Sequence, residues 1–423
     1  MHQAFAYSTL ALTVALAVSR PRVGTSGLRV TPGIAAVLGV AALLVAGVIH
    51  VEDLATSARL QWRPLLALTC IMVMTGAVKE VGAFERVALR IEARAKATSA
   101  TQAFTLVFIV SAVTPSLLNN DAAILILTPV VVGLARRLYP GNTKMIEAFV
   151  FAVFLAPGVA PFIISNPMNM IVAEFAGIGF NAYAAVMAPI SVVGALLTYV
   201  ILRLHYRGVL ATAAADPRPV VLPAAHRAER PAIALLLAVF CAYPVMAAMG
   251  GPIWVIAVVG ACACVALVWR YRVTSGSKLL GHVSVDILAF LWGVFVVASG
   301  LRNVGVVDRL AALYEAQPAG SGQQLAVVGG IAALGSAIVD NHPMSILNML
   351  ALGNGGGSRP LLAALVGGDI GPRLLPIGSL AGLLWMDLLR RSGIEIGIGK
   401  FLRIGTLVLI PTLAVSLVML WVL

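Results

Sequence analysis

Carboxylate and amide side chains interrupt the sequence where it is otherwise apolar. Asn119, Asn120 and Asp121 separate the apolar runs 104–113 and 124–134. Each run alone is shorter than the roughly 20 residues that cross a bilayer, so together they predict a hairpin that turns inside the membrane. An ionised aspartate at that depth costs about 2.5–3.5 kcal/mol, and turn backbone is tolerated there only beside a cavity or within protein. The turn therefore indicates a binding site.

Three further polar breaks interrupt apolar segments: Ser165-Asn166-Pro167-Met168-Asn169, Asp340-Asn341-His342-Pro343 and Gly367-Gly368-Asp369-Ile370-Gly371-Pro372. Asn, Asp and Ser are preferred N-caps, and proline is favoured at the first helical position. Asn166-Pro167 and His342-Pro343 therefore each predict the start of a half-helix. Four half-helix ends bring backbone N–H groups, amides and carboxylates into one small volume. Such a volume suits a small polar solute or an ion, not a bulky apolar compound.

We predict that the substrate is bound by nine residues of these breaks: Asn119, Asn120, Ser165, Asn166, Asn169, Asn341, His342, Gly368 and Ser379. We predict that proton coupling uses three carboxylates: Asp121, Asp369 and Asp340.

Each of these residues also has a structural interpretation. The asparagines can simply cap helices, Ser379 can pack between helices, and His342 can be a hydrogen-bonded structural histidine instead of a proton-responsive group. Lys79 and Arg373 offer ion pairs to the buried aspartates.

The composition is that of a membrane protein. The chain has 423 residues, of which 60% are hydrophobic and 11% charged, and its mean hydropathy is +0.99, whereas soluble domains have about 25% charged residues. We therefore expect an all-α polytopic membrane protein in the lipid bilayer. The apolar stretch 4–19 lacks a preceding basic region and a clear cleavage site, so it is interpreted as a first span. The net charge of +12 comes from basic residues at the ends of apolar runs, which indicates the positive-inside rule and no nucleic-acid partner.

No cofactor or metal is expected. The four cysteines lie in apolar segments: Cys70, Cys241, Cys262 and Cys264. Cys262 and Cys264 would point in different directions on a helix, so we expect neither a disulfide framework nor a metal-thiolate site. The sequence has no Gly-x4-Gly-Lys-Ser/Thr and no His-Glu-x-x-His motif, which argues against an integral ATPase and a zinc protease.

The predicted spans are 4–19, 30–50, 64–84, 182–202, 231–249, 253–269, 285–301 and 402–422. Between them we expect a surface helix at 85–96, hairpins at 101–135 and 322–352, and broken helices within 146–176 and 361–388. The predicted organisation is a first repeat at 1–205, a linker loop at 206–230 and a second repeat at 231–423.

The two halves resemble one another. Residues 78–88 are similar to residues 301–311, and a polar hairpin tip follows each stretch. When the chain is threaded with its amino terminus outside, most of its 29 Lys and Arg residues fall on the side of the 206–230 loop, which is therefore expected to be cytoplasmic. The first hairpin then enters from the cytoplasm and the second from outside. Inverted repeats of this kind are typical of secondary transporters with a site near the midplane of the bilayer.

Three segments resemble the ArsB arsenite efflux permeases of the ion transporter superfamily: residues 120–129, 164–169 and 368–381. The similarity covers nearly the whole chain. It implies an inner-membrane transporter, not an enzyme, that exports trivalent arsenite and antimonite from the cytoplasm while protons move inward. It also implies an elevator-like or rocking movement of the core that carries both hairpins, and association with a cytoplasmic ArsA-type ATPase.

The chain departs from the family at two places. Asp340-Asn341-His342-Pro343 stands where family members carry Asn-Asn-Met-Pro, and residues 156–161 lack an acidic residue found in the family. Both differences bear on the proton route more than on the substrate. Near neutral pH arsenite is mostly an uncharged trihydroxide, which amides, hydroxyls and helix ends can satisfy, whereas thiolates would bind it too tightly for release.

Other functions remain open from sequence. A sodium/proton antiporter of the same superfamily would use Asp121, Asp340 and Asp369. A dicarboxylate carrier would show paired Ser-Asn-Thr signatures, which are absent. The chain would alternatively anchor an ATPase through its 203–230 loop, or be an intramembrane enzyme, although no nucleophile–base pair is visible.

Overall fold

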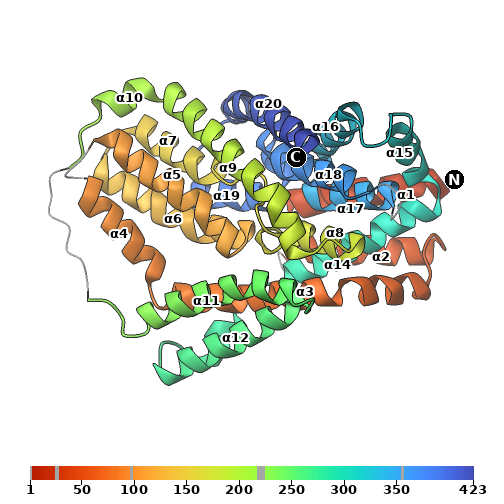
Figure 1. Cartoon of the computed structure of the whole chain (residues 1–423), viewed down its shortest axis with the longest axis horizontal. Helices are drawn as coiled ribbons and strands as arrows, with labels where there is room; N and C mark the ends of the chain where they lie inside the picture. Colours follow the sequence, from red (N-terminus) through yellow and green to blue (C-terminus); the bar gives the residue numbers. More distant parts are fainter. Residues whose placement is uncertain (1, 24–27, 96–98, 217–223, 354–356) are drawn as a thin grey trace.

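The structure, a computed structural model, describes residues 2–23, 28–95, 99–216, 224–353 and 357–423. Nearly all of these residues are helical (Figure 1). Within the described residues, eight helical segments are long and apolar enough to cross a membrane. The predicted all-α polytopic class is therefore confirmed. Of the predicted linker loop at 206–230, residues 217–223 lie outside the described residues.

The elements of the first half are α1 (His2–Ser19), β1 (Arg22–Val23), β2 (Leu28–Arg29), α2 (Pro32–Val45), α3 (Val51–Glu80), α4 (Ala83–Ala95), α5 (Ala100–Leu117), α6 (Asn120–Leu138), α7 (Thr143–Leu155), η1 (Ile163–Ser165), α8 (Pro167–Ala176), α9 (Phe180–His205) and α10 (Arg207–Thr212).

The elements of the second half are α11 (Glu229–Ala248), α12 (Ile253–Arg270), α13 (Gly276–Leu280), α14 (Val285–Asn303), α15 (Val306–Glu315), α16 (Gly322–Val339), α17 (Asn341–Leu352), α18 (Ser358–Ile370), η2 (Gly371–Arg373), η3 (Pro376–Gly378), α19 (Leu380–Arg391) and α20 (Ile398–Val422).

The order of elements in the second half repeats that of the first. In each half a long helix ends at a glycine turn and a short amphipathic helix follows, α3 then α4 and α14 then α15. The turns contain Gly82 and Gly305, whose φ angles of 78° and 75° are rarely adopted by other residues. A helical hairpin and a broken helix come next in both halves. Opposite orientation of the halves in the membrane remains a prediction.

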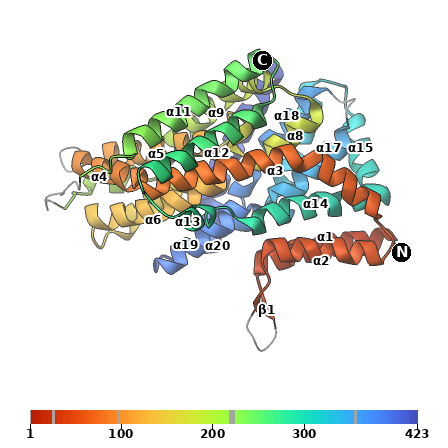
Figure 2. The ribbon, with the colours of Figure 1, turned by 90° about the horizontal axis from the view of Figure 1, so that it is seen from below.

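Helices of the two halves pack across one another. α2 lies against α14, α3 against α12, and α9 against α20. α1 and α2 lie along one edge of the molecule, and the short antiparallel β1–β2 ribbon that joins them projects away from the helices (Figure 2).

Three boundaries differ from the sequence-based expectation. α3 begins at Val51 and not at residue 64, because Asp53 accepts a hydrogen bond from the backbone N–H of His50 (2.8 Å) and starts the helix. Its first turns carry exposed charges outside the apolar window, such as Arg59. α2 ends at Val45 and not at residue 50, because the chain turns at Gly47 with φ 66°. The first hairpin, α5 and α6, runs from Ala100 to Leu138 and is therefore three residues longer at its end than predicted.

The broken helices owe their shape to proline and glycine. Pro157 and Pro161 follow α7, and Pro372 and Pro376 follow α18, where each removes a backbone donor and disfavours helix in the residue before it. α16 and α18 approach closely, because a Cβ atom on Gly367 would touch the backbone of Gly329 and lie 2.7 Å from Ala332 Cβ.

Candidate functional site

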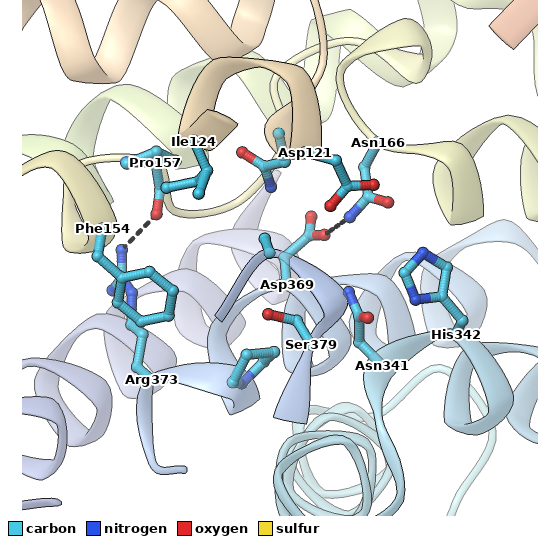
Figure 3. Close-up of a pocket in the computed structure, with 13 residues that line it drawn as sticks. Asp121, Ile124, Phe154, Pro157, Asn166, Asn341, His342, Asp369, Arg373 and Ser379 are labelled. Carbon is cyan, nitrogen blue, oxygen red and sulfur yellow. Dashed lines mark hydrogen bonds between the residues drawn. The ribbon is translucent and has the colours of Figure 1, made fainter. Parts of the chain in front are cut away.

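The breaks of both halves converge on one buried cavity of about 40 Å³ (Figure 3). Eight polar or charged residues line it: Asn120 and Asp121 from α6, Asn166 before α8, Asn341 and His342 from α17, Asp369 from α18, Arg373 from η2, and Ser379 before α19. Elements more than 200 residues apart in the chain therefore share one small polar volume.

Helix N-termini surround this volume, each capped by a polar side chain. Asn119 Oδ1 accepts from Ala122 N (2.9 Å) at α6, and Asn166 Oδ1 accepts from Met168 N (3.2 Å) at α8. Ser379 Oγ accepts from Gly382 N (3.0 Å) at α19. Helix N-termini carry partial positive charge and free N–H groups, so they favour oxygen-bearing ligands.

The α17 cap corrects one expectation. The helix starts at Asn341, so His342-Pro343 is not its cap-and-first-turn pair. Asp340 is the N-cap, at φ 77°, and its Oδ1 accepts from His342 N (2.9 Å) and contacts His342 Nδ1 (2.8 Å). Aspartate tolerates positive φ better than most residues because its side chain can hydrogen-bond locally. Asp340 thus holds the imidazole and does not line the cavity.

Asp369 is held by donors from the first half of the chain. Asn166 Nδ2 donates to its Oδ1 (2.7 Å), while Ala160 N and Asn169 Nδ2 donate to Oδ2 (2.9 and 3.3 Å). Three donors of this kind satisfy an ionised carboxylate. Neither Asp369 nor Asp121 forms an ion pair with any described residue, so the structure does not show the alternative pairing with Lys79 or Arg373.

Asp121, Asn341 and His342 each keep a buried polar atom without a partner among the described residues. These atoms are Asp121 Oδ2, Asn341 Oδ1 and His342 Nε2. A buried polar atom without a hydrogen bond costs about 1–3 kcal/mol. Together with Arg373 Nε, which is also buried without a partner among the described residues, these atoms around one cavity indicate that a polar ligand completes the site.

Arg373 joins the two halves beneath the cavity. Its Nη2 donates to the carbonyls of Leu155 (2.8 Å) and Pro157 (3.1 Å), and its Nη1 donates to Thr412 Oγ1 (2.9 Å). The side chain is buried and also lies beside Gly158, where a Cβ atom would be 2.9 Å from Nη2. Arg373 therefore closes the carboxyl end of α7 with a charged donor.

Five residues predicted for the site lie just outside the cavity lining. Ser165 donates to Ser116 O (3.2 Å), and Gly368 lies against Ser345. Asn169 reaches the cavity only through Asp369. The remaining two are Asp340 and Asn119, and Asn119 lines a neighbouring cavity.

That neighbouring cavity, of about 80 Å³, shares Asp121 with the central one. Lys79, His282 and Thr75 also line it. At its far side Glu80 accepts from Lys278 Nζ (2.8 Å) and contacts His282 Nε2 (3.0 Å). Asp121 thus lies between the central cavity and the neighbouring cavity and lines both.

Sequence analysis missed several residues of the site. Tyr183 accepts from Asn169 Nδ2 (2.6 Å) and donates to Ala160 O (3.0 Å), and it supports Asp369 indirectly. Ile124, Phe154, Pro157 and Ala381 also line the cavity, as does Pro372 of a predicted break. Arg373 was considered only as an ion-pair partner, although an arginine within an apolar segment is itself a signal. None of the four cysteines lines either cavity; Cys70 and Cys264 are buried elsewhere, and Cys241 and Cys262 are exposed.

A chain of membrane-spanning helices whose breaks enclose a small polar cavity belongs to the class of membrane transporters. The solved structures that it resembles agree with this fold. The superposition on the YdaH transporter of Alcanivorax borkumensis covers 100% of this chain and 97% of that chain, with a TM-score of 0.56 and 17% identity. For Neisseria gonorrhoeae MtrF, described as one of a class of antimetabolite efflux pumps, coverage is 100% and 94%, with a TM-score of 0.52 and 11% identity.

The family model for ArsB, "arsenical pump membrane protein", matches residues 6–423. An arsenical pump membrane protein of Escherichia coli is 30% identical over 419 residues, which are 96% of this chain and 95% of the relative. The chain therefore belongs to the ArsB arsenical pump family, and the resemblance inferred from its motifs is confirmed. It is an integral membrane transporter of the arsenical efflux type.

Proposed function

We propose that this protein exports trivalent arsenite and antimonite from the cytoplasm, across the inner membrane, in exchange for protons. The observation that carries the proposal is the set of unpartnered buried atoms of Asp121, Asn341 and His342 around a cavity of about 40 Å³. A cavity needs a volume of about 10–15 Å³ to hold one water molecule. The cavity thus suits a solute about as large as three waters, such as a trihydroxide with four non-hydrogen atoms.

The hydrogen-bonding roles match such a solute. Asp121 Oδ2 and Asn341 Oδ1 are acceptors. His342 Nδ1 faces the Asp340 carboxylate at 2.8 Å, and because an ionised carboxylate only accepts, Nδ1 carries a proton; Nε2 accepts a hydrogen bond when the ring is neutral and donates one when the ring is protonated. The two acceptors can each take an O–H group of the solute, and a hydroxyl can pair with His342 Nε2 in either role. No thiol of the described chain lines the cavity, so release does not require breaking an arsenic–sulfur bond.

We assign the coupling proton to Asp121 ahead of Asp369. The Asp369 carboxylate already accepts three hydrogen bonds, whereas Asp121 Oδ2 accepts none. When the solute leaves, Asp121 loses its donor, and proton uptake satisfies the exposed oxygen. The empty carrier then returns protonated, and Asp121 releases its proton to the cytoplasm by way of the neighbouring 80 Å³ cavity before the next solute binds.

The test is arsenite uptake into everted membrane vesicles from cells that produce this chain and no ArsA-type ATPase, with the interior made acidic and no ATP present. We expect uptake by the wild type and by Asp308→Asn, a control at an exposed aspartate of α15. Asp121→Asn should reduce gradient-driven uptake by about tenfold or more and keep arsenite exchange without a gradient. Gradient-driven uptake by the Asp121→Asn/Asp369→Asn double variant would disprove the proton assignment, and lack of uptake by the wild type would disprove the function.

The same vesicles separate the competing functions. A sodium/proton antiporter would show sodium-dependent loss of the pH gradient that arsenite does not alter. That function would use three carboxylates, and one of them, Asp340, instead contacts the His342 ring (2.8 Å). A need for added ArsA-type ATPase and ATP would instead make the chain an anchor, whereas stimulation of existing uptake would make the ATPase a partner.

A further inference from the structure

A large cavity with an arginine-rich wall lies away from the site described above. Its volume is about 430 Å³, and it lies between the end of α1, the β1–β2 ribbon and the segment that leads into α19. Its polar wall contains Arg20, Arg29, Arg390 and Asp387. We call it the arginine-lined cavity.

The arginine-lined cavity has an excess of positive charge. Arg20, Arg29 and Arg390 have no ion-pair partner among the described residues, whereas Asp387 is paired with Arg391 outside the cavity lining (2.8 Å). In addition, Arg20 Nε is buried without a hydrogen-bond acceptor. A buried guanidinium donor without an acceptor is costly, and guanidinium groups match phosphate oxygens in geometry and charge.

The apolar part of the cavity lining is called its floor. It is formed by Leu375, Pro376, Ile377, Leu383, Met386 and Ile398. Ser19 ends the apolar helix α1 and Ile398 begins the membrane-spanning helix α20, so the cavity lies at helix ends, where lipid headgroups meet the hydrocarbon. Arginines beside apolar side chains at this level match an amphiphile with an anionic head.

We propose that the arginine-lined cavity binds the headgroup of an anionic phospholipid. The three arginines hold the phosphodiester, and the glycerol and first methylenes cover the apolar floor. A free phosphate ion would satisfy the arginines and leave six apolar side chains uncovered. The floor also includes Pro376 and Ile377, and Ser379 lies two residues after Ile377 in the chain. A bound lipid thus packs against the turn that presents Ser379 to the central cavity.

The test is lipid retention by the purified full-length protein, measured by native mass spectrometry after exchange into mixed phosphatidylglycerol and phosphatidylcholine. We expect the wild type to retain phosphatidylglycerol selectively. An Arg20→Gln/Arg29→Gln/Arg390→Gln variant should lose this preference by a factor on the order of a hundred. The matched control, Arg203→Gln/Arg207→Gln/Arg270→Gln, removes three exposed arginines elsewhere at helix ends and should keep it.

Two further arms keep the proposal falsifiable. Arg390→Gln alone alters an exposed side chain, so it should fold and bind phosphatidylglycerol more weakly than the wild type. Excess inorganic phosphate should not displace the lipid. Equal retention by the wild type and the Arg390→Gln variant, or displacement by phosphate, would overturn the proposal. This readout does not depend on what the protein transports.

Discussion

Asp121, which is buried, and Asp369, which is half-buried, line the same cavity, yet their surroundings differ. Three donors hold Asp369, all of them from the segment around α7 and α8, whereas one oxygen of Asp121 has no partner among the described residues. The sequence indicated both residues because each interrupts an apolar segment at a high cost. It could not distinguish them, because the donors to Asp369 lie 200 or more residues away in the chain.

Arg373 provides the residue-scale prediction. Replacing it with Met removes hydrogen bonds from a charged donor to Leu155 O, Pro157 O and Thr412 Oγ1, and each such bond contributes about 1.5–3 kcal/mol. We expect Arg373→Met to lower the thermal unfolding midpoint of the purified protein clearly, and Thr412→Val to lower it less. The control is Arg59→Met, at an exposed arginine of α3. Equal midpoints for Arg373→Met and Arg59→Met would contradict the anchoring role.

The anchoring role of Arg373 was not predictable from sequence. Its partners are mainly backbone carbonyls of the other half, and a carbonyl carries no signal in the residue type. By contrast, Asn166-Pro167 was recognised as a helix start because the cap and the proline adjoin in the chain, and α8 does begin at Pro167. Local chemistry was readable, and distant backbone partners were not.

At the scale of elements, most helix positions follow from apolar periodicity, but the starts of α3 and α17 do not. α3 extends 13 residues before the predicted start at residue 64, because an amphipathic helix can continue outside the apolar window. α17 starts before His342-Pro343 because Asp340 caps it with a positive φ, which the residue types around it do not predict. In both cases a capping interaction decided the boundary.

The packing of α16 on α18 predicts opposite effects on stability for alanine at two glycines. A Cβ on Gly367 would touch Gly329 O and lie 2.9 Å from Ala333 N, so Gly367→Ala should separate the helices and destabilise the protein by about 1–3 kcal/mol. A Cβ on Gly330, inside α16, meets nothing within 4 Å, so Gly330→Ala should be neutral or stabilise by up to about 1 kcal/mol. Thermal unfolding measures both, and destabilisation by Gly330→Ala equal to that by Gly367→Ala would refute the close-packing argument.

For the whole molecule, the repeated element order leaves open how the halves face the membrane, and labelling can decide it. Arg90 on α4 and Arg309 on α15 are exposed and occupy corresponding helices. In a background without native cysteines, an impermeant maleimide should label Arg309→Cys in intact cells and Arg90→Cys only in everted vesicles. Labelling of both from the same side would contradict inverted repeats and the predicted cytoplasmic loop.

The cysteines lie apart from the central and the neighbouring cavity, and this bears on how the protein handles a solute that reacts with thiols. Trivalent arsenic bonds tightly to thiols, so a cysteine along the passage of an arsenite carrier would hold the solute instead of releasing it. Here Cys70, Cys241, Cys262 and Cys264 line neither the central nor the neighbouring cavity. If the protein carries arsenite as proposed, neither cavity offers a thiol that would retain the solute.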